Sequence, residues 1–207
     1  MKEVTIDSLD QLIDMLGGSI SDISFCNEDI EKLGEDFDMR YPDYSSASPK
    51  IKIMLDNIKN DIKLFRKRTY VRTVFSYIEG MLFAMKRILL EDYEDLNDED
   101  IIKLQEYRLV GANAEKLQKK PVFIDLKENM KFTFDKYGKI RANNYQTDFN
   151  SNDWENFKKC IKIRNKITHP KHSDDLIVTD EEYKKVQMAH DWFFKILNKL
   201  QKEENST

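Results

Sequence analysis

Cysteine, glycine and proline are scarce in this chain of 207 residues. The two cysteines, Cys26 and Cys160, form no CxxC pair. This usage suits a protein of a reduced, cytosolic compartment better than a scaffold held by disulfides. Six glycines and four prolines allow few tight turns, which disfavours an all-β fold and favours helices.

Long apolar runs are absent as well. The longest unbroken runs are only a few residues, far short of the roughly 20 that a membrane-spanning helix needs. The N-terminal residues MKEVTIDSLDQL lack the apolar region of a signal peptide, so we expect a cytoplasmic protein. The net charge of −4 does not itself indicate nucleic-acid binding, so the local distribution of charge must carry that argument.

The patterns that are present are mostly helical. Residues 51–90 contain no Pro and only Gly80, which predicts either one very long helix or two stacked helices with a break near 67–69. Within 71–89 the apolar residues recur at i, i+3, i+4 and i+7, the spacing of a core-facing helix. A short helix is expected at roughly 98–107.

Two more helices are expected near the C-terminus. SNDWENFKKCIKIRNKI predicts a helix with Ser151 or Asn152 as its N-cap. TDEE, at 179–182, is a capping-box pattern that opens a last helix running to about Leu200. His190 lies on the apolar face of this helix and is expected to be a core or interface residue.

Residues 120–143 have a different character. PVFIDL is typical of a strand, and MKFTFDKYGKIRA alternates around a Gly turn, so we predict a β-hairpin there. The expected fold is mainly α: an up-and-down helical bundle over 46–203 with this small β-hairpin insertion at about 120–143. Residues 1–45 are expected to form an N-terminal arm with short helices, and 204–207 a frayed tail.

The segment CIKIRNKITHPK carries an arginine in an unusual position. On a helical projection Trp154, Phe157 and Ile161 share one face, and the next position on that face is Arg164. A guanidinium there must be paired, or must line a cleft or an interface. Pro170 disfavours helix for the preceding residue, so the helix should end at about Ile167 or Thr168 and bring His169 beside its last turn.

Two runs carry Lys and Arg but no acidic residue: 158–172, which contains Arg164, and 63–72, which lies far from it in the sequence. They could form a channel for a polyphosphate, or they could simply be solvated helix faces. The candidate RNA-binding residues are Lys162, Lys166, Lys171, Arg68 and Arg72.

With RNKITH, Arg164 to His169, the sequence resembles the HEPN superfamily of small helical-bundle proteins. The signature of that family is R-x(4–6)-H at the end of the third main helix of the bundle. Asn165 matches the polar residue that is common directly after the Arg, and Glu79, on YVRTVFSYIEGMLFAMK, matches an acid on the first long helix of the family. The resemblance covers roughly 51–200.

The resemblance implies a metal-independent endoribonuclease, without a cofactor, that works as a homodimer. It further implies that the two motifs meet at the subunit interface and form one composite cleft, and that Arg164 and His169 are the catalytic residues. Many such proteins are toxins or phage-defence effectors, some with an antitoxin or another neutralising partner. Other members are catalytically inactive modules that bind RNA or protein, and this remains the alternative reading.

Several roles stay open at this point. Glu79 could orient the catalytic pair or be a plain charge on the flank of its helix. Asn165 could bind the scissile phosphate or cap the helix end. His169 and His172, followed by two aspartates, could hold a metal, but Pro170 prevents helical ligand spacing, and we expect none.

Overall fold

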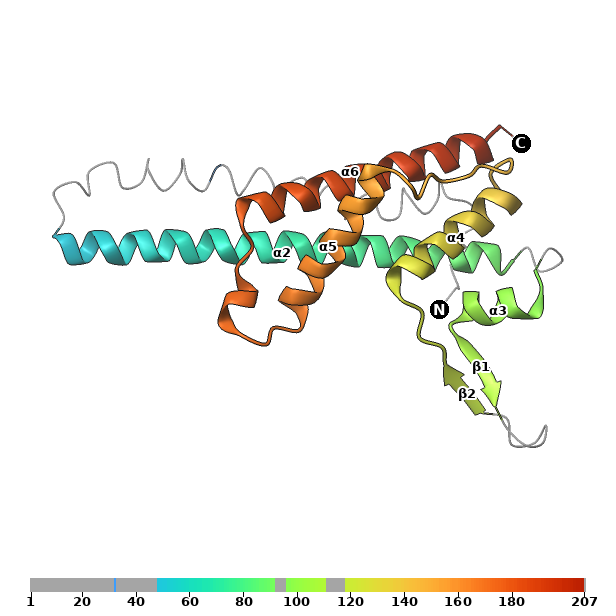
Figure 1. The fold of residues 1–207 in the computed structure, drawn as a ribbon, viewed down its shortest axis with the longest axis horizontal. Helices are drawn as coiled ribbons and strands as arrows, with labels where there is room; N and C mark the ends of the chain where they lie inside the picture. Colours follow the sequence, from blue (N-terminus) through green and yellow to red (C-terminus); the bar gives the residue numbers. More distant parts are fainter. Residues whose placement is uncertain (1–31, 33–47, 92–95, 111–117, 207) are drawn as a thin grey trace, which may run out of the picture. The chain divides into compact units, whose positions relative to one another are not determined.

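The computed structural model of the chain describes residues 32, 48–91, 96–110 and 118–206. The expected N-terminal arm therefore lies outside the described residues, apart from Lys32, which is helical. The described part is mainly α-helical, with a single two-stranded antiparallel sheet among these residues, as the sequence predicted (Figure 1). The elements in chain order are α2 (Pro49–Leu89), α3 (Asp98–Gln105), β1 (Tyr107–Val110), β2 (Gln118–Pro121), α4 (Leu126–Ile140), α5 (Asn152–Thr168), the 3₁₀ helix η4 (Ser173–Leu176) and α6 (Asp180–Glu204).

The chain divides into two compact units, to each of which α2 and α6 contribute residues. Unit 1 contains the described residues 78–91, 96–110, 118–154 and 191–206. Unit 2 contains the described residues 32, 48–77 and 155–190, and therefore the Arg164–His169 motif.

Helix α2 is one continuous helix, so the break considered near 67–69 does not occur. The apolar residues predicted to face the core between 71 and 89 are all buried, which confirms the helical periodicity. They are Val71, Val74, Phe75, Ile78, Met81, Leu82, Met85, Ile88 and Leu89.

The core of unit 2 joins α2 to α5 and α6 through aromatic contacts. The Tyr70 ring lies 4.9 Å from that of Tyr183, and the Phe75 ring lies 6.0 Å from that of Phe157. Large aromatic side chains contribute most of the apolar area that such a small core can bury. These contacts fix α5, and so its C-terminal end, against α2 and α6.

The predicted position of the hairpin was wrong. The two strands are 107–110 and 118–121, and 126–140 forms helix α4. In α4 the buried residues Met130, Thr133, Phe134 and Tyr137 follow helical spacing. Phe132, which a strand would place on the same face as Phe134, is only half-buried.

Gly138 does not make the turn that alternation suggested. It lies in the last turn of α4, where the following residues fold back across it. The N–H groups of Arg141 and Ala142 both donate to the carbonyl oxygen of Tyr137. A Cβ atom at Gly138 would collide with the carbonyl oxygen of Tyr145, so this glycine is needed for close backbone approach.

Helix α6 ends at Glu204, a few residues beyond the predicted end at about Leu200. The reason is a contact within unit 1: the Tyr137 hydroxyl and Arg141 Nε both donate to Glu204 Oε1, at 3.0 and 3.2 Å. At its start, Glu182 N–H donates to Thr179 Oγ1 and Thr179 N–H donates to the Glu182 carboxylate. This confirms the predicted capping box.

Candidate functional site at the C-terminal turn of α5

Helix α5 has the boundaries that its sequence predicted. Ser151 Oγ accepts a hydrogen bond from the N–H of Trp154 and caps the first turn. The last helical residue is Thr168, directly before His169 and Pro170. We call the segment 164–169 the α5 C-terminal turn.

The α5 C-terminal turn is closed by bonds to its own carbonyl groups. Thr168 Oγ1 donates to the carbonyl oxygen of Arg164 at 2.8 Å, and His169 N–H donates to that of Asn165 at 3.0 Å. The bond from His169 keeps the chain close to the helix for one residue beyond its end. Arg164 and His169 therefore leave the backbone about 7.5 Å apart along the helix axis, since each residue rises about 1.5 Å.

The two motif side chains differ in exposure. Arg164, which was predicted to lie on the apolar face of this helix, is half-buried, and the neighbouring Ile161, Ile163 and Ile167 are buried. Its Nη1 donates to Asn165 Oδ1 at 3.0 Å, so Asn165 contacts the guanidinium. His169 is exposed. The end of α5 therefore carries two groups: a guanidinium that an amide orients, and an imidazole that is accessible to solvent.

Cations of α2 hold this helix end and the segment that follows it. Arg72 Nη2 donates to the carbonyl oxygen of Ile167 at 3.0 Å, in the last turn of α5. Arg68 Nη1 donates to the carbonyl oxygen of Leu176 at 3.2 Å. Carbonyl oxygens at a helix C-terminus have no partner within the helix and carry partial negative charge, so they attract cations.

Two lysines, Lys67 and Lys166, make similar contacts. We call the four residues Arg68, Arg72, Lys67 and Lys166 the loop anchors. Lys67, whose side chain is only 4% exposed, donates to Asp180 Oδ1 at 2.6 Å. Lys166 donates to the carbonyl oxygen of Ile177 at 3.0 Å and to Glu182 at 2.7 Å. The connection from α5 to α6 is thereby tied to both α2 and α5.

The predicted RNA-binding residues thus fall into two groups. Lys166, Arg68 and Arg72 bind carbonyl or carboxylate groups of the protein itself. Lys162 and Lys171 are exposed, and their side chains form no hydrogen bond or ion pair within the described ranges. Sequence reasoning missed the anchoring role because it joins segments about a hundred residues apart.

Carboxylates of the α5–α6 connection and of the first turn of α6 have lowered pKa values. The backbone N–H groups of Lys171 and His172 donate to Asp175 and hold its pKa below the ordinary 3.8. The hydrogen bond from Lys67, and then its charge, lower the pKa of Asp180. Burial raises the pKa of Glu182, but hydrogen bonds from Lys166 and Thr179 outweigh it and the net shift is downward. Each carboxylate is therefore more acidic in the folded protein.

We expect acid to weaken this connection. A carboxylate whose pKa is lower in the folded state stabilises that state fully above its unfolded pKa, and the contribution is lost as the pH falls through the folded value. The unfolding temperature should thus decline as the pH drops below about 4, near the ordinary values of 3.8 and 4.5. Thermal unfolding followed by circular dichroism at graded pH measures this.

Asp180→Asn is the informative variant for this prediction. It should be less stable at neutral pH, because the buried Lys67 loses its carboxylate partner, and its acid-induced decline should be shallower. An equally steep decline in Asp180→Asn would contradict the assignment.

The other sequence candidates lie in different surroundings. Cys160 is buried, and burial raises its pKa to about 12, so the thiol is a packed residue and not an activated nucleophile. His190 packs near Tyr77, with the ring centroids 6.2 Å apart. Glu79 lies on α2 in unit 1, whereas the motif lies in unit 2. Among the described residues, no three His, Cys, Asp or Glu side chains are grouped closely enough to bind a metal ion.

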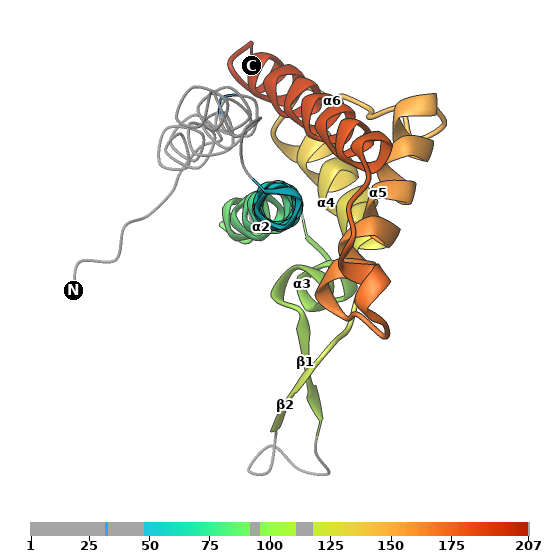
Figure 2. The same ribbon diagram turned by 90° about the vertical axis from the view of Figure 1, so that its left-hand side faces the viewer.

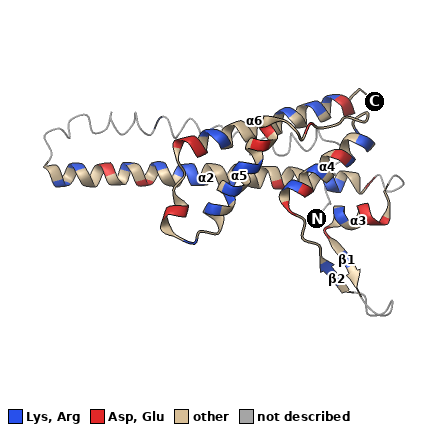
Figure 3. Ribbon diagram, viewed as in Figure 1, with Lys and Arg blue, Asp and Glu red and all other residues tan. Residues whose placement is uncertain are grey.

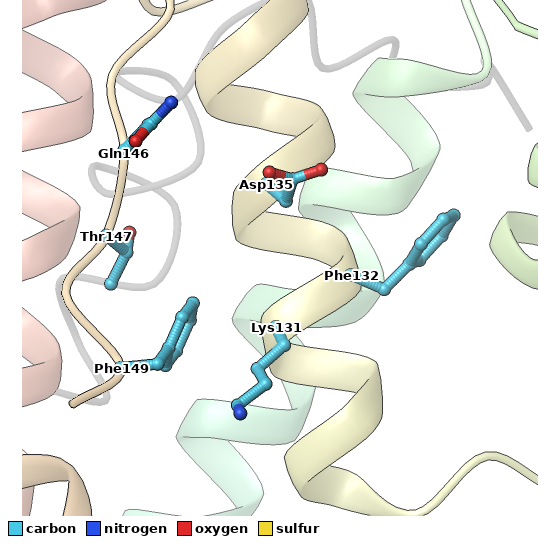
Figure 4. Close-up of a pocket in the computed structure, with 6 residues that line it drawn as sticks. All are labelled: Lys131, Phe132, Asp135, Gln146, Thr147 and Phe149. Atoms are coloured by element: carbon cyan, nitrogen blue, oxygen red, sulfur yellow. The ribbon is translucent and has the colours of Figure 1, made fainter.

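Unit 1 has a pocket of about 500 Å³ between α4 and the chain that leads into α5 (Figure 4). The Lys131 ammonium in its wall lies 5.6 Å from the ring centroid of Phe149. Thr147 Oγ1 is buried and has no hydrogen-bond partner in the part of the chain that the structure describes. No sequence pattern indicated this pocket, because its walls come from two segments whose residue patterns are ordinary. It is lined by Lys131, Phe132, Asp135, Gln146, Thr147 and Phe149.

None of the helices in the described ranges is both long enough and apolar enough to cross a membrane. Comparison of the chain with protein-family models, with curated proteins and with solved structures gave no match.

Proposed function

We propose that this protein is a metal-independent endoribonuclease of HEPN type, in which Arg164 and His169 cut RNA. One observation carries the proposal: the half-buried Arg164 and the exposed His169 lie five residues apart at the end of α5, about 7.5 Å along the helix axis. The mainly helical fold and the position of the motif at a helix end agree with the resemblance in the sequence.

The two side chains suit phosphodiester transesterification. The ribose 2′-oxygen attacks the phosphorus, its proton passes to a base, and the bond from phosphorus to the 5′-oxygen breaks as that oxygen receives a proton from an acid. Histidine can serve as either group near neutral pH. Arginine stays charged and grips two phosphate oxygens at once, which stabilises the negative transition state. The products are a 2′,3′-cyclic phosphate and a 5′-hydroxyl end.

A homodimer supplies what one chain lacks. Each chain has one His in the motif, whereas the reaction needs both an acid and a base. Two copies whose α5 C-terminal turns meet would bring two imidazoles and two guanidinium groups to one phosphate. The exposure of His169 leaves it accessible to a second copy.

The loop anchors support this role by ordering the backbone around the motif. Arg72 binds the last turn of α5 from α2, and Lys166 ties the turn to Ile177 and Glu182. Catalytic groups work best when their positions are set before the substrate binds. His169 therefore follows a helix end that is fixed from two sides.

Cleavage of single-stranded RNA in the presence of EDTA tests the proposal. We expect wild-type protein to cut a labelled oligoribonucleotide and to leave 2′,3′-cyclic phosphate ends. An oligonucleotide with 2′-deoxyribose throughout should stay intact, because it has no 2′-oxygen nucleophile. RNA binding without cleavage would favour the non-catalytic module instead, and cleavage that requires a divalent metal would refute the mechanism.

A further inference from the structure

The hairpin of unit 1 has two like charges directly opposite each other. In the antiparallel register Tyr107 pairs with Pro121, Arg108 with Lys120 and Leu109 with Lys119. Side chains of directly paired residues project from the same face of a sheet. Arg108 and Lys120 are both exposed, and their side chains have no ion pair or hydrogen bond to any described residue.

This pairing is unfavourable for the hairpin alone. Like charges directly opposite each other destabilise a strand pair. A two-stranded sheet has little stability to spare, and all four residues of β2 are exposed. Neither strand contains an acid. A bound anion would remove the repulsion that the protein itself leaves in place.

The acid directly before β1 does not neutralise these charges. Glu106 Oε1 accepts a hydrogen bond at 2.7 Å from Lys86, whose side chain is only 1% exposed. The carbonyl oxygen of Glu106 also accepts a bond from the N–H of Val122, just after β2. The base of the hairpin is thus fixed to α2, while the strands extend away from α3 and the start of α4 (Figure 2).

Apolar and aromatic side chains accompany the cations. Phe123, two residues after β2, is 99% exposed, and Leu109 is 55% exposed. Lys119 Nζ lies 4.5 Å from the ring centroid of Tyr107 on the second face of the hairpin. Cations that follow a phosphate backbone, together with rings on which bases stack, are the two components of single-strand binding.

We propose that this hairpin, 107–110 with 118–123, is an RNA-binding arm: Arg108 and Lys120 bind backbone phosphates of single-stranded RNA, and Phe123 stacks on a base. The choice of RNA among polyanions rests on the proposed ribonuclease activity. The arm lies in unit 1, and the α5 C-terminal turn lies in unit 2. Figure 3 shows the Lys and Arg residues of the described chain, including those of β2, in blue. Its role is to hold substrate, and it takes no part in bond breaking.

Equilibrium binding to a labelled 2′-O-methyl RNA strand tests the arm without cleavage, since this strand has no free 2′-hydroxyl. The test variant is Arg108→Gln with Lys120→Gln, which relieves the repulsion and should keep the hairpin folded. The matched control is Lys139→Gln with Lys199→Gln, which removes two exposed cations of unit 1 from α4 and α6. Both variants change the net charge by the same amount.

Each phosphate contact on a single strand contributes about 0.7 to the slope of log affinity against log salt. We therefore expect the test variant to lose about 1.4 of this slope, and roughly 25-fold in affinity near 0.1 M salt, with little change in the control. Phe123→Ala should weaken binding while leaving the slope intact. Equal losses in test and control variants, or an unchanged slope in the test variant, would overturn the proposal.

Two further outcomes separate this inference from its alternatives. If the wild-type protein binds RNA through the arm but cuts no RNA, the arm proposal stands and the nuclease proposal is refuted. If the protein cuts RNA and the arm variants bind it as well as wild type, the nuclease proposal stands and the arm proposal is refuted. Anionic lipid vesicles serve as the second probe. Loss of vesicle binding in the test variant, with RNA binding unchanged, would assign the arm to a membrane surface and overturn the proposal.

Discussion

His169→Ala is expected to lower the rate of RNA cleavage by about 10²–10⁴-fold, the usual contribution of a positioned acid or base. Because the His169 side chain is exposed, the free energy of unfolding should change by less than about 0.5 kcal/mol. The measurement is single-turnover cleavage in EDTA, together with chemical denaturation of the same preparation. The two readouts separate lost chemistry from lost structure.

His172→Ala is the matched control for this prediction. His172 is also exposed and lies three residues further along the chain, outside the motif. Its loss should leave the cleavage rate within about twofold, since a residue outside the reacting geometry contributes little to the barrier. Equal loss of activity in His172→Ala and His169→Ala would contradict the assignment, and so would full activity in His169→Ala.

Two substitutions of Arg164 separate charge from geometry. Arg164→Ala removes a donor to the transition state and should cost about 10²–10³-fold. Arg164→Lys keeps the charge but loses the planar fork, so it should recover only part of that loss. If the protein is a toxin, the same variants should relieve growth inhibition when it is expressed.

Gly138→Ala is expected to lower the free energy of unfolding by about 3 kcal/mol, at the upper end of what overpacking usually costs. The added Cβ would overlap the carbonyl oxygen of Tyr145 and come within 3.1 Å of its carbonyl carbon. Backbone atoms cannot rotate away as the end of a side chain can. The turn is further constrained by Asn143 and Asn144, which have positive φ values of 46° and 59°. Urea unfolding followed by circular dichroism gives the measurement.

Gly80→Ala is the matched control, and we expect it to raise the free energy of unfolding instead of lowering it. Gly80 lies within α2, and a Cβ atom there would meet nothing within 4 Å. Alanine favours a helix over glycine by about 1 kcal/mol, so this variant should be more stable than wild type. If both alanine variants shifted stability in the same direction, close approach at Gly138 would not explain the result.

The sequence predicted best where the signal was local. The N-cap at Ser151, the helix end before Pro170 and the capping box at Thr179 each depend on residues within one turn of one another. The apolar face of α2 was also visible, because its periodicity continues through 71–89. A projection of 152–168 placed Arg164 on the apolar face of α5, and the structure has this residue half-buried.

The sequence prediction put the hairpin in the wrong segment because the apolar residues of that segment fit both the two-residue period of a strand and the 3.6-residue period of a helix. Met130, Phe132 and Phe134 alternate as in a strand, whereas Met130, Phe134 and Tyr137 are spaced as in a helix. The deciding contacts lie outside the segment, in the packing of Phe134 against Phe193 at 5.7 Å and in the bond from Tyr137 to Glu204. A single sequence gives no access to such distant partners.

The loop anchors change how a charge scan of this protein should be interpreted. Arg68 Nη1 and Arg72 Nη2 each donate to a carbonyl oxygen of the protein, so a substitution of either residue removes a structural contact as well as a charge. Replacing either arginine with alanine would loosen the segment bearing the motif. A resulting loss of RNA cleavage would then reflect altered loop structure, and only a change in salt slope would reveal a lost phosphate contact.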